Sequence, residues 1–129
     1  MRRQSAVSRE DQYAAICAAL WAERELMQAL TIAMVNARLA GDESVGDWRS
    51  ERSVMDRLAL QDVLRAAMVE SLVATDEAPR GVTLPYLVVT APEPWSTMLV
   101  DHGQALRALL TDLATLGDVQ QLSLAEFLG

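Results

Sequence analysis

Apolar residues recur at helical spacing along residues 8–40 and form two rows whose members lie mostly seven positions apart. One row contains Tyr13, Leu20, Met27 and Met34. The other contains Ile16, Leu30 and Ala37, and Leu26 and Ala33 extend the same face. Trp21, Ile32 and Val35 lie off both rows. This segment therefore predicts a helix with more apolar surface than one neighbouring helix covers, so that it is enclosed or waits for a partner.

Signals at both ends of this segment define where the first helix starts and stops. Ser8 is a typical N-cap residue, and Glu10 and Asp11 place negative charge in the first turn. Gly41 suits the left-handed conformation that ends many helices. The predicted helix is about 32 residues long, or roughly 48 Å. The short polar link at residues 41–46 predicts that the next helix returns antiparallel to the first.

A second helix is predicted over residues 47–75. Its main apolar stripe consists of Val54, Leu58, Met68 and Leu72. Residues 78–81 break this helix, and residues 83–86 predict the start of a short one, since Pro85 is tolerated in a first helical turn. Residues 86–89 are also compatible with a strand, but no second strand exists to pair with them. We therefore expect one or two helical turns.

The last long helix is predicted to start at residues 92–94 and to end near Leu116. Its stripe is Trp95, His102, Leu109 and Leu116, supported by Met98, Leu99, Leu106, Leu110 and Leu113. In the tail that follows, Ser123 and Glu126 have capping-box spacing, and Leu122 and Phe127 have hydrophobic-staple spacing. The tail therefore predicts a short amphipathic helix, which either docks on the protein's own bundle or binds a partner.

Together these elements predict an all-α protein, an antiparallel bundle of three long helices with a short connecting helix and a short C-terminal amphipathic tail. The length of 129 residues fits one domain that buries a core without metals or disulfides. We assign residues 1–117 to the helical bundle domain and residues 118–129 to the tail.

Charge and composition narrow the classes of partner and compartment. The net charge is −7, and the eleven basic residues, all arginines, are scattered, which argues against nucleic acid. No uncharged stretch approaches the ~20 residues that cross a bilayer, and residues 8–11 are polar where a signal peptide is apolar. We expect a cytoplasmic protein without stable membrane insertion. Cys17 is alone, and its helical position suits a core residue better than a reactive thiol.

No enzyme class finds positive support in the sequence. A di-iron carboxylate bundle needs paired Glu-x-x-His motifs, and this chain has one histidine. No serine stands in a glycine-flanked turn after a predicted strand, and no glycine-rich phosphate loop is present. We expect no catalysis, no metal and no cofactor.

Three polar residues interrupt the apolar stripes of the three long helices: Glu23, Arg65 and His102. A buried charge must be paired, because an unpaired one costs several kcal/mol. If the helices align in register, the three side chains form one polar layer, with Asp62 and Asp101 nearby. This layer is a register-fixing ion pair, a site or pH switch at His102, or a set of solvated side chains.

Several segments resemble FlgN-type flagellar export chaperones, particularly the actinobacterial versions. The resemblance covers roughly residues 14–113, in the family's order and spacing. The matching segments are Leu20-Trp21-Ala22-Glu23-Arg24-Glu25-Leu26, Ser53-Val54-Met55, Leu64-Arg65-Ala66, and Ala91-Pro92-Glu93-Pro94-Trp95 followed by Asp101-His102. The Pro-Glu-Pro-Trp segment with the downstream Asp-His is the most specific of them.

The resemblance implies an all-helical cytoplasmic chaperone of bacterial flagellar type III secretion. Such chaperones hold the C-terminal helical segments of the hook–filament junction proteins FlgK and FlgL and deliver them to the export gate. Their client-binding activity is usually placed in the C-terminal part. We therefore expect client contacts from Leu106, Leu109, Leu110, Leu113, Leu116, Leu122, Leu124, Phe127 and Leu128, and weaker client binding when residues 118–129 are removed. Phe127, the only aromatic residue of the tail, is a candidate for docking on the gate.

Two other interpretations stay open at this point. In the first, the spare apolar face of the first helix pairs with a second copy of the chain, and the protein is a homodimeric scaffold or a regulatory interaction module. Alternatively the protein is an enzyme, which requires a polar pocket among Glu23, Arg65 and His102.

Overall fold

The computed structural model describes residues 8–40, 45–76, 82–116 and 122–129, without the side chains of residues 40, 45–51, 73–76, 122 and 123. Its elements are α1 (Arg9–Ala40), α2 (Val45–Asp76), α3 (Leu84–Thr90), α4 (Trp95–Leu116) and α5 (Leu122–Leu128). The described residues contain helices and short connections and no strand. The prediction of an all-helical chain is confirmed, and residues 86–89 are helical.

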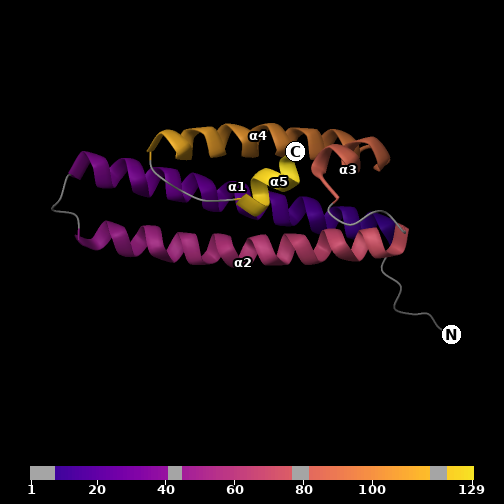
Figure 1. Ribbon diagram of the computed structural model, residues 1–129, viewed down its shortest axis with the longest axis horizontal. Helices are drawn as coiled ribbons and strands as arrows, with labels where there is room; N and C mark the ends of the chain where they lie inside the picture. Colours follow the sequence, from indigo (N-terminus) through magenta and orange to yellow (C-terminus); the bar gives the residue numbers. More distant parts are fainter. Residues whose placement is uncertain (1–7, 41–44, 77–81, 117–121) are drawn as a thin grey trace.

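The helix α1 is the central element, and α2 and α4 pack along it (Figure 1). The chain reverses between α1 and α2, so these two helices are antiparallel. The helix α4 runs in the same direction as α1, because α3 and its connections return the chain to the end where α1 begins. Two contacts show this register: Arg24 meets Asp101, and fourteen residues further along α1, Arg38 donates to the backbone carbonyl of Leu116.

Local polar contacts account for the starts of α1 and α4. The backbone N–H of Asp11 donates to the Ser8 side-chain oxygen at 3.1 Å, the N-cap contact expected from the sequence. The Glu93 carboxylate accepts hydrogen bonds from the Thr97 backbone N–H at 3.0 Å and from its hydroxyl at 2.8 Å. The helix α5 begins at Leu122, two residues before Leu124, the first helical residue that a capping box at Ser123 predicts.

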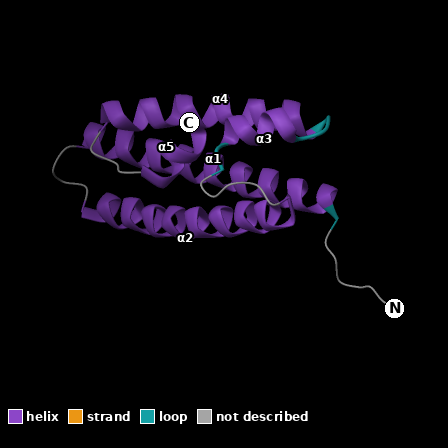
Figure 2. Ribbon diagram, turned by 45° about the vertical axis from the view of Figure 1, so that its right-hand side comes forward, coloured by secondary structure: helices purple, strands orange, loops and turns teal. Residues whose placement is uncertain are grey.

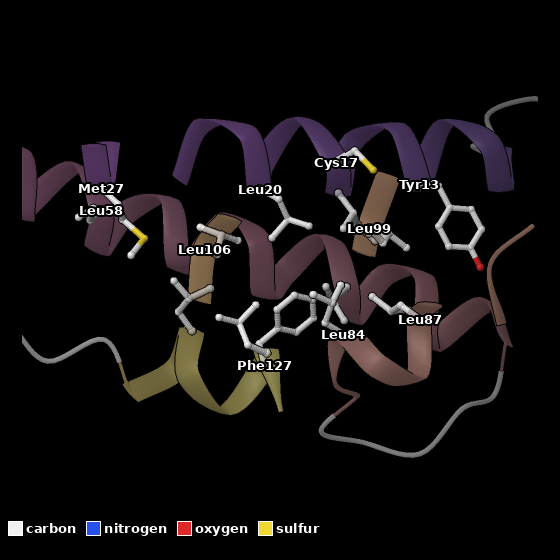
Figure 3. Close-up of a cluster of buried hydrophobic side chains, with 14 of the residues drawn as sticks. Tyr13, Cys17, Leu20, Met27, Leu58, Leu84, Leu87, Leu99, Leu106 and Phe127 are labelled. Carbon is white, nitrogen blue, oxygen red and sulfur yellow. The ribbon is translucent and has the colours of Figure 1, made fainter. Parts of the chain in front are cut away.

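Both apolar rows of α1 face the core. Tyr13, Leu20 and Met27 of one row and Ile16 and Leu30 of the other are buried. Their side chains meet leucines from α2, α3 and α4, together with residues of α5 (Figure 3). Both rows therefore lie on the side of α1 that faces the core of the protein.

The apolar residues of α1 that lie off these rows stay at the surface. Trp21 is 50% exposed, Ile32 is 61% exposed and Leu39 is 82% exposed. α2 and α4 leave at least half of the surface of each of these side chains exposed, so the fold covers the apolar surplus of the first helix only in part. Within the described residues, no helix has the length and apolar character needed to span a membrane.

Cys17 lies in the core. It is 5% exposed, and burial raises the pKa of its thiol from 9.0 to about 11. The thiolate is therefore scarce at neutral pH, which fits the core role expected for this residue.

Candidate functional site

The helix α5 lies between α2 and α4 in both ribbon views (Figures 1 and 2) and packs against α3 and α4. Its apolar residues are covered: Leu124 is 0% exposed, Phe127 is 7% exposed and Leu128 is 2% exposed. A helix of only seven residues has little stability in isolation, so tertiary packing holds it. The surface of α1, α2, α3 and α4 that receives these side chains, here named the α5 groove, is the candidate functional site.

The apolar part of the α5 groove is formed by buried leucines from three helices. Figure 3 shows Phe127 pointing from α5 into a cluster that includes Leu20, Leu84 and Leu106. Gly103 of α4 permits α3 to approach closely, because a Cβ at this position would lie 2.6 Å from Leu84 Cδ2. These leucines form an apolar surface against which the apolar side chains of α5 pack.

The end of α5 lies close to α3 and α4. The Arg107 side chain on α4 donates to the backbone carbonyl of Leu128. Gly129 adopts a φ of +87°, in the left-handed region that favours glycine, and a Cβ there would lie 3.0 Å from Pro85. The end of α5 therefore lies close to both α3 and α4.

A buried ion pair lies beneath Phe127. Arg65 Nη1 lies 2.5 Å from Glu23 Oε2, and both residues are at most 1% exposed. Arg65 also donates through Nη2 to Asp62 on its own helix. The guanidinium carbon of Arg65 is 5.1 Å from the centroid of the Phe127 ring, a cation–π distance. The tail residue therefore covers the charge that joins α1 to α2.

The electrostatic environment of Glu23 is unfavourable to its charge. Burial raises the pKa of the Glu23 carboxyl, and the negative charge of Asp62 acts in the same direction. Arg65 lowers the pKa through its charge and its hydrogen bond but does not offset burial. The second oxygen, Oε1, is buried without a hydrogen-bond partner. Such a pair fixes the register of two helices more than it stabilises them.

His102 does not join this pair, so the single polar layer expected from Glu23, Arg65 and His102 is incorrect. Instead, His102 Nδ1 lies 3.1 Å from Arg24 Nη1, and Arg24 reaches Asp101 at 3.2 Å. The cause is helical geometry: Glu23 and Arg24 are neighbours in sequence and point about 100° apart. The first faces α2 and the second faces α4.

The cluster around His102 also includes an aromatic side chain. The Trp21 ring meets the imidazole edge to face, with centroids 6.2 Å apart and planes at 72°, and the Arg24 guanidinium carbon lies 4.7 Å from the Trp21 centroid. Burial lowers the pKa of His102, the positive charge of Arg24 lowers it further, and Asp101 partly opposes both. The imidazole is therefore neutral at pH 7, with Nδ1 accepting from Arg24.

The residues expected to contact a client are mostly covered by the chain itself. Leu106, Leu113, Leu124, Phe127 and Leu128 are buried, Leu109, Leu110 and Leu116 are partly buried, and the Leu122 side chain is outside the described residues. The structure thus brings the last long helix and the tail together on one apolar surface.

Several contacts at the site had no clear signal in the sequence. Arg24 and Arg107 have the sequence pattern of ordinary surface arginines, yet Arg24 contacts His102 and Arg107 contacts the end of α5.

Within the part of the chain that the structure describes, no group of three His, Cys, Asp or Glu residues is arranged to hold a metal. Comparisons with family models, curated proteins and solved structures find no match to this chain.

Proposed function

We propose that the protein is a helix-binding chaperone whose α5 groove holds α5 in the resting state and an amphipathic client helix in the loaded state. The observation that carries this proposal is the occupied groove itself. A seven-residue helix buries Leu124, Phe127 and Leu128 in it, so its shape and chemistry suit an amphipathic helix. Helix-in-groove binding uses the same apolar anchors at i, i+3 and i+4.

The resemblance to FlgN-type chaperones supports the choice of client. The clients we propose are the C-terminal helical segments of FlgK- and FlgL-type hook–filament junction proteins, held in the cytoplasm and delivered to the flagellar export gate. An amphipathic segment of this kind aggregates when its apolar face has no partner. A chaperone covers this apolar face with an apolar groove, and this activity requires neither catalysis nor a cofactor.

The burial of α5 reverses one expectation drawn from the sequence. If the tail contacted the client directly, its removal would weaken client binding. With the tail seated in the groove, α5 and the client compete for the same surface. The apparent dissociation constant for the client then equals the intrinsic one divided by the fraction of molecules with an open groove. Weakening the attachment of α5 is therefore expected to tighten client binding.

An arginine outside the core offers a mild way to loosen α5. Arg107→Ala removes the donor to the Leu128 carbonyl and leaves the apolar groove unchanged. We expect calorimetric titration with the C-terminal helical segment of a hook–filament junction protein to give binding roughly two- to tenfold tighter, because a hydrogen bond contributes about 0.5–1.5 kcal/mol.

The matched control for this experiment is Arg52→Ala on α2, an exposed arginine paired with Asp56. It should leave the client affinity unchanged. Weaker binding by the Arg107 variant would mean that the tail contacts the client, as the sequence suggested. If neither the wild type nor the variants bind the client segment, the alternative of a homodimeric scaffold or regulatory module is favoured. The exposed apolar residues of α1 are the feature that supports this alternative.

A further inference from the structure

The exposed side of α1 carries a seam of eight positions spaced alternately four and three residues apart. They are Ala14, Ala18, Trp21, Glu25, Gln28, Ile32, Val35 and Leu39, and each of them is exposed. This spacing keeps the side chains on one face of a helix over three and a half heptads. The seam is about 37 Å long at 1.5 Å per residue.

Six of the eight seam residues are apolar, although the seam faces away from the core. Ile32 and Leu39 are 61% and 82% exposed. Most of the apolar α1 residues that pack inside the protein belong to the other two rows, so α1 is apolar on two separate faces. One face is used by the fold, and the other has the heptad spacing with which helices pair with one another.

The central tryptophan of the seam is held in place before any partner arrives. Trp21 is 50% exposed, and its ring contacts both the Arg24 guanidinium and the His102 ring. A side chain that is already ordered loses little conformational entropy on binding. Exposed, ordered tryptophans are typical anchors of protein interfaces.

We propose that a second copy of this chain covers the seam, with the two α1 helices packed antiparallel around a two-fold axis between residues 26 and 27. The sizes of the side chains match in this arrangement. Ala14 lies opposite Leu39 of the second copy, Ala18 opposite Val35, and Trp21 opposite Ile32. The small residues at one end of the seam thereby meet the larger ones at the other end.

The two polar positions of the seam fix the orientation. In the antiparallel pair, Glu25 lies opposite Gln28 of the second copy on both sides of the axis, and the amide can donate to the carboxylate. In a parallel pair, Glu25 would face Glu25, and Ala14 and Ala18 would leave gaps. One polar layer in an apolar seam sets register and direction in paired helices. The seam is separate from the α5 groove, so both copies keep their grooves.

The first test compares two substitutions at equally exposed positions. Ile32 on the seam and Leu60 on α2 are each 61% exposed. We expect sedimentation across a concentration series to show a monomer–dimer equilibrium. Ile32→Glu should raise the dimer dissociation constant more than roughly tenfold, since it places two charges in the apolar seam. Leu60→Glu should leave it unchanged. A wild-type monomer at all concentrations up to about 1 mM, or equal dissociation by both variants, would overturn the proposal.

The second test determines direction, using thiols in a Cys17→Ala background whose folding is checked by thermal melting. In the antiparallel register, residues 18 and 35 of opposite copies are adjacent, whereas the two residues 18 are about 25 Å apart. A short thiol cross-linker should therefore join copies that carry both Ala18→Cys and Val35→Cys, and neither single variant should be joined. Cross-linking of the Ala18→Cys variant alone would show parallel pairing, and no cross-linking of the double variant would exclude the seam.

The third test changes the charges of the central polar pair, Glu25 and Gln28, in two steps. Gln28→Glu places two carboxylates opposite each other on both sides of the axis, so it should weaken the dimer. Adding Glu25→Lys to that variant restores opposite charges and should recover the wild-type dissociation constant. Failure of the second substitution to recover the dimer would contradict the proposed register.

Discussion

The centroid of the Phe127 ring lies 5.1 Å from the guanidinium carbon of Arg65, so a residue of α5 covers the buried ion pair between α1 and α2. This contact joins three elements that are distant in sequence. It also means that the stability of the two-helix hairpin depends on whether α5 is docked. Loss of the tail from its groove opens the face of the Arg65–Glu23 pair to water.

Two substitutions at Phe127 separate burial from the cation–π contact. Phe127→Ala removes both, and buried Phe→Ala changes cost about 3–5 kcal/mol. Phe127→Leu keeps most of the apolar contact and loses the aromatic face, so it should cost about 0.5–2 kcal/mol. Urea denaturation measures both. A leucine variant as stable as wild type would show that the ring contributes no cation–π stabilisation.

A double-mutant cycle measures the coupling between Glu23 and Arg65. Arg65→Ala leaves the Glu23 carboxyl buried without its partner, so this variant should lose about 3–5 kcal/mol of unfolding free energy. Glu23→Ala should lose less, because Arg65 keeps Asp62 as a partner. The double variant should lose less than the sum, with a coupling of about 1–3 kcal/mol. The Asp62→Ala variant serves as a comparison, because the Asp62 side chain is 22% exposed and its loss should cost less. Additive losses at Glu23 and Arg65 would contradict a functional ion pair.

The lowered pKa of His102 predicts a stability that falls in acid. The unfolded imidazole takes up a proton near its ordinary pKa of 6.5, while the folded one resists protonation because it is buried and lies beside Arg24. The contribution of His102 to stability is therefore complete above pH 6.5 and is lost as the pH falls through the lower folded pKa. Equilibrium unfolding of wild type and His102→Asn at several pH values below 6.5 tests this. The asparagine variant should lack that part of the pH dependence, and identical pH profiles would refute it.

Gly103 is predicted to be intolerant of a side chain because α3 packs directly on it. Gly103→Ala places a Cβ 2.6 Å from Leu84 Cδ2, and overpacking costs about 1–3 kcal/mol. The better helix propensity of alanine offsets up to about 1 kcal/mol of that cost. Chemical denaturation should therefore show a net loss of stability. In the Leu84→Ala background the same substitution should be neutral or stabilising, because the clashing atom is gone.

The local signals of the chain determined its secondary structure. Ser8 with its acidic first turn, Pro85, and the prolines before Trp95 act on residues within one turn, so they specify where α1, α3 and α4 begin without reference to the rest of the molecule. The heptad rows of α1 likewise identified which side chains enter the core, since periodicity assigns a residue to a face.

Periodicity does not give the rotation of one helix relative to another, and this is what the tertiary structure decided. Glu23, Arg65 and His102 interrupt their stripes in similar ways, yet the placement of α2 and α4 on different sides of α1 separates them into two clusters. The same placement leaves Trp21, Ile32 and Leu39 uncovered and opens the groove that α5 fills. Sequence alone predicted that α1 carries more apolar surface than one neighbouring helix covers. Only the packing of the other helices established which of these residues remain exposed, because burial depends on neighbours distant along the chain.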